Sequence, residues 1–526
     1  MMCITARQRA AAAATLAALL TALLALTTAT AIGPVWLPTV RAAHLPFSDV
    51  ALALATYRHH AYMLSTRLDP TRSDAPAGVY FTTDESGAWT TRLLSARAPL
   101  QLIEENQTAL ALDPNTRRLY AAWAYNARPG YDTIGVWTRD AAGTWRGPRA
   151  ISTLSSEGPA SVVAAQGKVY VAFTAQEDAS SAPCHNSRTD VFVTAYDGST
   201  WSAPQNVTNC VSGLANGDNF YAPRLALDGG HLYLTSANSS HATWDLWYMD
   251  NAGGPWSRPV RITHGRENDL YHYDYSIAAS EGTAYVAYTA YTGVQGGGTF
   301  GHHDVFLATH APGGSWTFRD VTKEPYNCDK YAPALVARAG RLALAYVFAD
   351  VNSGACGSSA AASEPSMGVH LLTGTPGHWV EAPLTRGNDN AKASLALSSD
   401  GDLFRVVYSN SVDNVGSDTT DVFYKPEFLD VVGPTTHLSV TATATAPSIR
   451  IRWSAQDPTP GSGVANYVVQ VRDGAGPWQD LTPQGTRSTF LVYAQLQSGH
   501  RYTFHVRARD KVNNWGAWVS AGTHVR

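Results

Sequence analysis

The sequence predicts an all-β chain in which a seven-bladed β-propeller precedes a smaller β-sandwich. A four-strand pattern recurs along most of the 526 residues, and a different strand pattern replaces it from about Gly433. Tyr (25), Trp (15) and Gly (43) are abundant, which suits many short strands joined by tight turns. We therefore expect a propeller over residues 34–430 and a sandwich over residues 433–526, because one ordinary core could not serve a chain of this length.

The propeller prediction rests on a repeat that is easiest to align at its third strand. This strand recurs seven times, and each copy begins with Gly or Asp followed by apolar residues. The copies are GVYFTT from Gly78, GVWTR from Gly135, DVFVTA from Asp190, DLWYMD from Asp245, DVFLAT from Asp304, GVHLLT from Gly368 and DVFYK from Asp421. A four-stranded unit repeated this often is typical of a β-propeller, because neighbouring sheets must cover its faces. Six blades are the alternative count.

The fourth strand of the repeat is missing from the last unit. In six units this strand opens with a Trp, at positions 89, 145, 201, 256, 316 and 379. A terminal strand can complete the last sheet and protect its edge. The segment from Trp36 to Arg41 resembles the one from Trp256 to Arg261, so we expect it to supply this strand, with residues 428–432 as the alternative donor.

Six alternating strands follow in the last 94 residues, which is a sandwich pattern. Trp453 on the second strand is the expected core tryptophan. The stretch Leu496-Gln-Ser-Gly499-His-Arg-Tyr502 resembles the tyrosine corner of fibronectin type III domains. This resemblance implies a spacer, display or adhesion module.

The first 31 residues are typical of an export signal. Arg7 and Arg9 precede an apolar run that ends at Ala31, and Ala29-Thr30-Ala31 fits a small-residue cleavage site. A retained membrane anchor is the alternative. Because no later stretch has about 18 uninterrupted apolar residues, the mature chain is expected to lack a membrane span and to be secreted or held at the cell surface.

The charge balance excludes one class of partner. Without Arg7 and Arg9, 36 basic residues stand against 42 acidic ones, which does not favour nucleic-acid binding. We expect a glycan or an extracellular protein as the partner, and a monomeric chain.

Propeller geometry separates short turns from long loops. The turns between first and second strands are short, as at Asp228-Gly-Gly230, whereas the loops between second and third strands are long, as at residues 289–303 and 348–367. Long loops on a rigid scaffold are where function concentrates. We therefore place the functional face at the long-loop end of the blades.

The four cysteines of the mature chain fit the same arrangement. Cys184 and Cys210 lie in neighbouring loops of the third blade, and Cys328 and Cys356 lie in neighbouring loops of the sixth. This favours disulfides 184–210 and 328–356, as an even count in an exported chain implies. Metal ligation is the alternative, although no CxxC spacing is present.

The turns between third and fourth strands carry a second resemblance. Thr82-Thr-Asp84-Glu-Ser-Gly87-Ala-Trp89 and Thr138-Arg-Asp140-Ala-Ala-Gly143-Thr-Trp145 resemble the Asp-box of sialidase-type propellers, and Thr194 to Trp201 keeps the spacing with Tyr196 in place of Asp. The resemblance implies that Asp84 and Asp140 stabilise the turn and that each Trp packs between blades. The family's first substrate arginine has no counterpart in residues 44–49, so only the scaffold is carried over.

Polar and aromatic residues precede the first strand of several blades. Because these positions are equivalent in the repeat, their side chains are expected to ring the mouth of the channel, where carboxylates, Tyr and His suit sugar recognition or acid–base chemistry. The alternative is that Asp side chains bind turn amides and Tyr side chains pack between sheets. The candidates are Asp218, Tyr221, Arg224, Glu267, Asp269, Tyr271, His272, Asp274, Asp329, Tyr331, Asp389 and Lys392.

Two interpretations of function remain open. The first is an exported binding protein whose propeller mouth recognises a glycan or a protein. The second is a sialidase-like glycoside hydrolase or lyase that uses paired carboxylates, such as Glu267 or Asp269 with Asp329. No cofactor is predicted. Calcium bound by Asp218, Asp389 and Asn390 is a weaker alternative, because no EF-hand-like spacing supports it.

Overall fold

The computed structural model describes the chain in segments, and all regular structure in them is β-strand. The described residues are 34–45, 52–67, 78–96, 108–128, 131–176, 189–208, 219–240, 243–252, 254–263, 274–292, 302–322, 329–349, 367–384, 395–400, 403–410, 420–429, 432–440, 443–444, 448–458, 462–511 and 514–526.

Six four-stranded antiparallel sheets follow one another along the chain, and we number them blades 1 to 6. Blade 1 contains β3 (Leu52–Tyr57), β4 (His60–Arg67), β5 (Gly78–Thr83) and β6 (Thr90–Ser95). Blade 2 contains β7 (Ala109–Asp113), β8 (Arg118–Arg128), β9 (Tyr131–Arg139) and β10 (Trp145–Ala150). Blade 3 contains β11 (Ser155–Ala165), β12 (Lys168–Gln176), β13 (Thr189–Tyr196) and β14 (Gln205–Asn206). Blade 4 contains β15 (Asn219–Asp228), β16 (His231–Ser240), β17 (Thr243–Asp250) and β18 (Val260–Arg261). Blade 5 contains β19 (Tyr275–Ser280), β20 (Thr283–Thr292), β21 (His302–His310) and β22 (Thr317–Asp320). Blade 6 contains β23 (Asp329–Arg338), β24 (Arg341–Ala349), β25 (Met367–Thr375) and β26 (His378–Pro383).

A seventh sheet joins the two ends of the propeller sequence. It contains β27 (Leu395–Asp400), β28 (Leu403–Asn410) and β29 (Thr420–Leu429), with β2 (Val40–Leu45) and β1 (Pro34–Trp36) both paired to β29. The N-terminal segment therefore supplies the closing strand, but not as one strand from Trp36 to Arg41. Instead β2 pairs with the first half of β29 and β1 with its last three residues. Phe428, part of the alternative donor, belongs to β29 itself.

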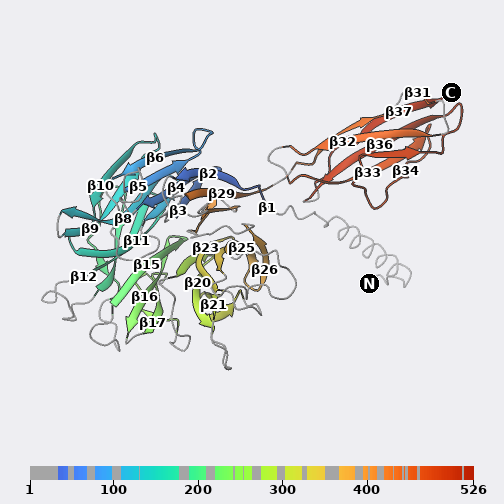
Figure 1. The fold of residues 1–526 in the computed structure, drawn as a ribbon. Coiled ribbons are helices and arrows are strands. Elements are labelled where there is room, and N and C mark those ends of the chain that lie inside the picture. Colours follow the sequence, from blue (N-terminus) through green and yellow to red (C-terminus); the bar gives the residue numbers. More distant parts are fainter. Residues whose placement is uncertain are drawn as a thin grey trace, which may run out of the picture. The chain divides into compact units, whose positions relative to one another are not determined.

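The seven sheets are arranged in a cycle (Figure 1). The first strand of each sheet contacts the first strand of the next, in the order β3, β7, β11, β15, β19, β23 and β27, and β27 contacts β3 again. Apolar side chains from facing sheets fill the spaces between blades, so each hydrophobic cluster draws on two neighbouring blades. Within the described residues, this is the arrangement that a seven-bladed propeller requires.

Hydrogen bonds at the short-turn end link one blade to the next. Asp113 ends β7, and its carboxylate accepts the N–H of Gly167 in blade 3 at 2.8 Å. Asp228 ends β15 and accepts the N–H of Gly282 in blade 5 at 2.7 Å. Both glycines have positive φ, at 78° and 77°, where a Cβ is disfavoured. This end of the propeller is therefore built by repeated, structural polar contacts.

The Asp residues of the turns between third and fourth strands bind different backbone groups. Asp140 accepts the N–H groups of Ala142 and Thr144 in its own turn, whereas Asp84 accepts the N–H of Ala61 at the start of β4. In blade 3 the turn is bound by Asp197, one residue after Tyr196, through the N–H groups at positions 199 and 200. These bonds hold the pKa of Asp197 below its usual range. The aligned position was therefore one residue too early in this turn.

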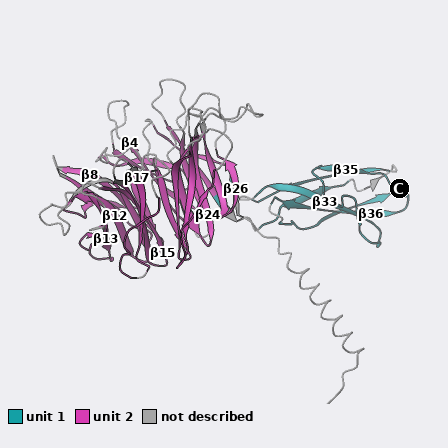
Figure 2. Cartoon of the chain, turned by 90° about the horizontal axis from the view of Figure 1, so that it is seen from below, with its two compact units in different colours: residues 1–37, 427–526 teal, residues 38–426 magenta. Residues whose placement is uncertain are grey.

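Contacts divide the chain into two compact units, residues 38–426 and residues 1–37 with 427–526 (Figure 2). In the second unit, two sheets form the C-terminal sandwich. One contains β30 (Thr435–Ser439), β32 (Ile449–Gln456) and β35 (Phe490–Tyr493). The other contains β31 (Thr443–Ala444), β37 (Val519–Val525), β36 (Arg501–Asp510), β33 (Val464–Asp473) and β34 (Gln479–Asp480).

The sandwich core has the two features that the sequence predicts. Trp453 is 4% exposed and packs edge-on against Tyr467. Tyr502 is also buried, and its hydroxyl accepts the N–H of Gln497 at 3.1 Å and donates to the carbonyl of Gln495 at 3.3 Å. This local bonding is the tyrosine corner, which ties the start of β36 to the preceding loop.

Candidate functional site

Strand A, the first strand of each blade, has a bulge at its long-loop end in blades 4 and 6. The same three residues, Tyr-Ala-Pro, form both bulges, at 221–223 and 331–333. Ala222 and Ala332 adopt positive φ values of 47° and 52°, which an alanine rarely does. A bulge redirects neighbouring side chains. It leaves Tyr221 and Tyr331 half-buried at this end.

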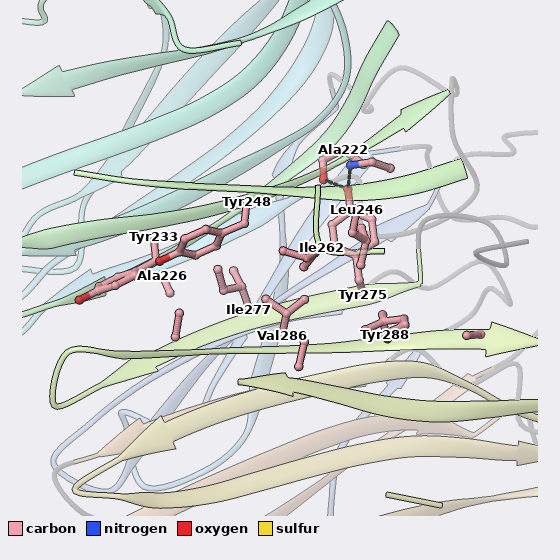
Figure 3. Packing of buried hydrophobic residues seen from close by; sticks show 14 residues of the cluster. Ala222, Ala226, Tyr233, Leu246, Tyr248, Ile262, Tyr275, Ile277, Val286 and Tyr288 are labelled. Atoms are coloured by element: carbon pink, nitrogen blue, oxygen red, sulfur yellow. Dashed lines mark hydrogen bonds between the residues drawn. The ribbon is translucent and has the colours of Figure 1, made fainter. Parts of the chain in front are cut away.

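Blade 5 holds both bulges in place. The buried hydroxyl of Tyr275 donates to the carbonyl of Ala222 at 2.5 Å and accepts the N–H of Ala237 at 2.9 Å (Figure 3). Burial raises the pKa of this phenol. On the other side, the carboxylate of Asp274 accepts the N–H of Ala332 at 3.0 Å and is 2% exposed. Asp274, a predicted site residue, therefore supports the backbone of blade 6.

Asp329 is also bonded to a backbone group of the neighbouring blade. Its Oδ1 accepts the N–H of His303 at 2.8 Å and lies 3.1 Å from Nδ1 of the same residue. Asn219 occupies the equivalent place in blade 4 and accepts the N–H of Thr189 at 2.9 Å. The backbone contact is thus a repeated feature, whereas the contact with an imidazole is an addition at blades 5 and 6.

The His303–Asp329 pair remains accessible. The two side chains are 19% and 21% exposed, and the ring of Tyr291 meets His303 edge-on with centroids 5.4 Å apart. A carboxylate that contacts Nδ1 fixes the orientation of an imidazole, as a general base requires. In the sequence His303 only follows a Gly-rich stretch, and its spatial relation to Asp329 is what distinguishes it.

A buried ion pair lies next to this dyad. Lys330 Nζ is 2.8 Å from Asp304 Oδ1, and both side chains are at most 3% exposed. The hydroxyl groups of Thr292 and Thr322 donate to the same carboxylate at 3.1 and 3.4 Å. The pair satisfies two charges that would otherwise be costly to bury.

The polar contacts continue into the outer strands of blade 6. Glu381 Oε1 lies 2.6 Å from His370 Nδ1 and accepts a hydrogen bond from the hydroxyl of Tyr346. The hydrogen bond with His370 is the main reason why the pKa of Glu381 is lowered, and Tyr346 and Lys330 act in the same direction. The boundary of blades 5 and 6 is therefore unusually polar.

Blade 4 contributes aromatic groups at the same end. Tyr221 and Trp244 are half-buried with ring centroids 5.5 Å apart, and the guanidinium of Arg224 lies 5.7 Å from the ring centre of Tyr275. We call these residues and the dyad, which lie at the same end of blades 4 to 6, the long-loop rim. Its residues are Tyr221, Arg224, Trp244, Tyr291, His303, Asp329 and Tyr331.

The other predicted residues lie outside the described part of the chain. These are Asp218, Glu267, Asp269, Tyr271, His272, Asp389 and Lys392, together with Cys184, Cys210, Cys328 and Cys356. The disulfides and the calcium alternative therefore stay predictions. Among the described residues, no group of three or more His, Cys, Asp or Glu is placed to hold a metal ion, and no helix is long and apolar enough to cross a membrane.

An aspartate recurs at the start of the third strand, and its role in hydrogen bonding within the blade was not predicted from the sequence. Asp190, Asp245 and Asp304 each accept a hydrogen bond from the hydroxyl of a threonine that follows the fourth strand of the same blade. In the last sheet Asp421 contacts His44 instead, at 2.7 Å. Four of the seven aligned third strands begin with Asp, and this recurrence was the available signal for a structural role.

Comparison with known proteins identifies the sandwich. The family model described as Fibronectin type III domain matches residues 433–521. The C-terminal domain is a fibronectin type III domain. The β37 strand of this fibronectin type III domain ends at Val525, a few residues beyond the match.

Solved structures similar to this chain include a polysaccharide lyase and a sialidase by their descriptions. The polysaccharide lyase Uly1 is 11% identical, with a TM-score of 0.45, over 73% of this chain and 90% of that one. Trypanosoma rangeli sialidase is 10% identical, with a TM-score of 0.39, over 92% of this chain and 89% of that one. At these values the likenesses carry no argument about what this chain does. No curated protein matches the chain.

Proposed function

We propose that this chain is an exported saccharide-binding protein whose propeller recognises a glycan at the long-loop rim. The observation that carries the proposal is the presence there of two half-buried ring pairs, the aromatic pair Tyr221–Trp244 and the aromatic–imidazole pair Tyr291–His303. Sugars are bound in this way, because an aromatic face covers the apolar side of a pyranose and polar groups fix its hydroxyls. In this proposal the leader directs export, and the fibronectin type III domain acts as a spacer.

The described carboxylates support binding over hydrolysis by paired acids. Asp274 and Asp329 are both engaged with backbone N–H groups of a neighbouring blade. A retaining or inverting hydrolase needs two carboxyl groups that face the substrate on either side of the scissile bond. Neither of these two residues is arranged for that task, because each accepts a bond that supports the scaffold.

A glycan array probed with the full chain tests the proposal. Trp244→Ala removes one ring of the rim and is expected to weaken binding by about tenfold or more, the loss typical of an aromatic anchor. Phe318→Ala is the matched control, because Phe318 is 49% exposed on the outer strand of blade 5. Equal binding by wild type and Trp244→Ala, or no glycan bound by the wild type, would show that the proposal is wrong.

Glycan cleavage is the second candidate function, favoured by the His303–Asp329 contact. In this case His303 would act as the base and Asp329 as its positioning residue. Turnover of fluorogenic glycosides and of uronate-containing polysaccharides distinguishes the two candidates. An enzyme should lose turnover in His303→Gln and show a lower kcat, with little change in KM, in Asp329→Asn. Binding without turnover in the wild type excludes this candidate for the substrates tested.

A further inference from the structure

A cleft opens between blades 2 and 3, away from the long-loop rim. Blade 2 contributes Arg118, Tyr120 and Arg149, and blade 3 contributes Tyr196 and Trp201 from its turn between β13 and β14. The cleft has a volume of about 80 Å³ and is open to solvent. Because Tyr196 ends β13 and pairs with Trp201 across the turn that follows, the cleft lies at the short-turn end of these blades.

The equivalent space at the boundary of blades 1 and 2 is filled. By strand register, Phe81 there takes the place of Val136, and Arg92 takes the place of Arg149. The Phe81 ring packs edge-on against Trp145 and lies beneath the guanidinium groups of Arg92 and Arg139. An aromatic ring at this position therefore fills the space between the blades and contacts the arginine that would otherwise face a ligand.

The boundary of blades 4 and 5 is filled in the same way. Tyr248 occupies the place of Val136 and packs against Trp316 and His310, with ring centroids 4.9 and 5.8 Å away. At blades 2 and 3 the smaller Val136 leaves the space open. The smaller Val136 therefore contributes to the open cleft, although Val193 holds the equivalent place at blades 3 and 4, so other side chains also decide where a cleft forms.

The open cleft presents groups that suit an anionic sugar. Arg118 and Arg149 are exposed, and neither forms an ion pair with a carboxylate in the part of the chain that the structure describes. In the same cleft, the rings of Tyr196 and Trp201 lie 5.3 Å apart and are half-buried. The Tyr196 hydroxyl donates to the carbonyl of Gly198 at 2.8 Å, which anchors the ring.

We propose that the cleft between blades 2 and 3 is a second binding site, specific for a pyranose that carries a carboxylate or a sulfate. Arg118 and Arg149 bind the anionic group, since a guanidinium can donate two parallel hydrogen bonds to two of its oxygens. Trp201 and Tyr196 cover the apolar side of the sugar ring. The site is independent of the long-loop rim, because it uses different blades and the opposite ends of the strands.

Isothermal titration of the full chain tests this site with three probes: tetragalacturonate, a sulfated heparin tetrasaccharide and neutral maltotetraose. Binding of one or both anionic probes, with none of the neutral one, is expected, and comparison of the first two identifies carboxylate or sulfate as the ligand. The double variant Arg118→Gln/Arg149→Gln should weaken this binding by about tenfold or more, the scale of lost hydrogen bonds to a charged group. Arg92→Gln is the matched control, because Arg92 holds the equivalent position above Phe81.

Val136→Phe provides a second variant that changes no charge. It should close the cleft and abolish anionic binding while the propeller stays folded, because Phe81 and Tyr248 are accommodated at equivalent positions. The rim variant Trp244→Ala should bind the anionic probes like the wild type, which separates this site from the proposed function. The proposal is overturned if the wild type binds neither anionic probe, or if the double arginine variant binds as tightly as the wild type.

Discussion

The boundary between blades 3 and 4 and the boundary between blades 5 and 6 share a backbone and differ in chemistry. At both, strand A of the later blade has a Tyr-Ala-Pro bulge, and the third strand of the earlier blade begins with a buried Asp. Residues 219–221 read Asn-Phe-Tyr at the first boundary, and residues 329–331 read Asp-Lys-Tyr at the second. Two adjacent side chains thus change from uncharged to charged.

The buried aspartates show what this difference does. Asp190 is bound by Thr208 and Asn206, and Phe220 is fully buried with its ring 6.0 Å from that of Trp247. Asp304 is bound by its threonines and by the ammonium group of Lys330. Within the described residues, the first boundary forms the same bulge with the buried Phe220 in the place of Lys330. The charged groups at blades 5 and 6 are therefore additions that accompany the His303–Asp329 dyad.

The largest expected effect comes from breaking the ion pair. Lys330→Met keeps the aliphatic volume and leaves Asp304 buried without its cation, which costs about 3–5 kcal/mol in comparable pairs. We expect the free energy of unfolding of the propeller to fall by that amount in urea denaturation of the full chain. A loss below about 1 kcal/mol would show that the threonines alone satisfy Asp304.

A double-mutant cycle provides the control for this prediction. Asp304→Asn removes the other charge, so the variant that combines it with Lys330→Met should be more stable than the sum of the single losses predicts. Phe220→Met is the matched change at the uncharged boundary. It should lower stability through packing alone and show no coupling with Asp304→Asn, because it lies in another blade.

The next effect concerns the dyad. Asp329→Asn makes the second boundary resemble the first, where Asn219 already accepts a backbone N–H. The backbone bond with His303 should persist and only the charged contact with the imidazole should be lost, so we expect about 1 kcal/mol or less of destabilisation. Thermal unfolding measures this change. A much larger loss would mean that the carboxylate charge supports the fold, contrary to the comparison.

The repeated strands of these boundaries could be predicted from the sequence. The side-chain contacts between one blade and the next could not. Seven aligned third strands indicate the propeller, because periodic apolar residues report which faces are buried. Lys330 and Asp304 are 26 positions apart, and their contact depends on how two blades meet, which no strand pattern encodes. Asp274 was expected at the channel mouth, yet it binds the N–H of Ala332 because a positive-φ bulge in the next blade needs an acceptor.

The smallest expected effect concerns how the stability of blade 6 depends on pH. The hydrogen bond from His370 lowers the pKa of Glu381 in the folded chain below its ordinary value of 4.5. A carboxyl group of this kind stabilises the fold above its unfolded pKa, and the contribution is lost as the pH falls through the folded pKa. We therefore expect Glu381→Gln to flatten the decline in melting temperature as the pH falls below about 4.5, the pKa of this group in the unfolded chain. Glu281→Gln, at a turn of blade 5, is the control. If both variants follow the wild-type curve, the polar contacts of blade 6 do not contribute to the acid sensitivity of the propeller.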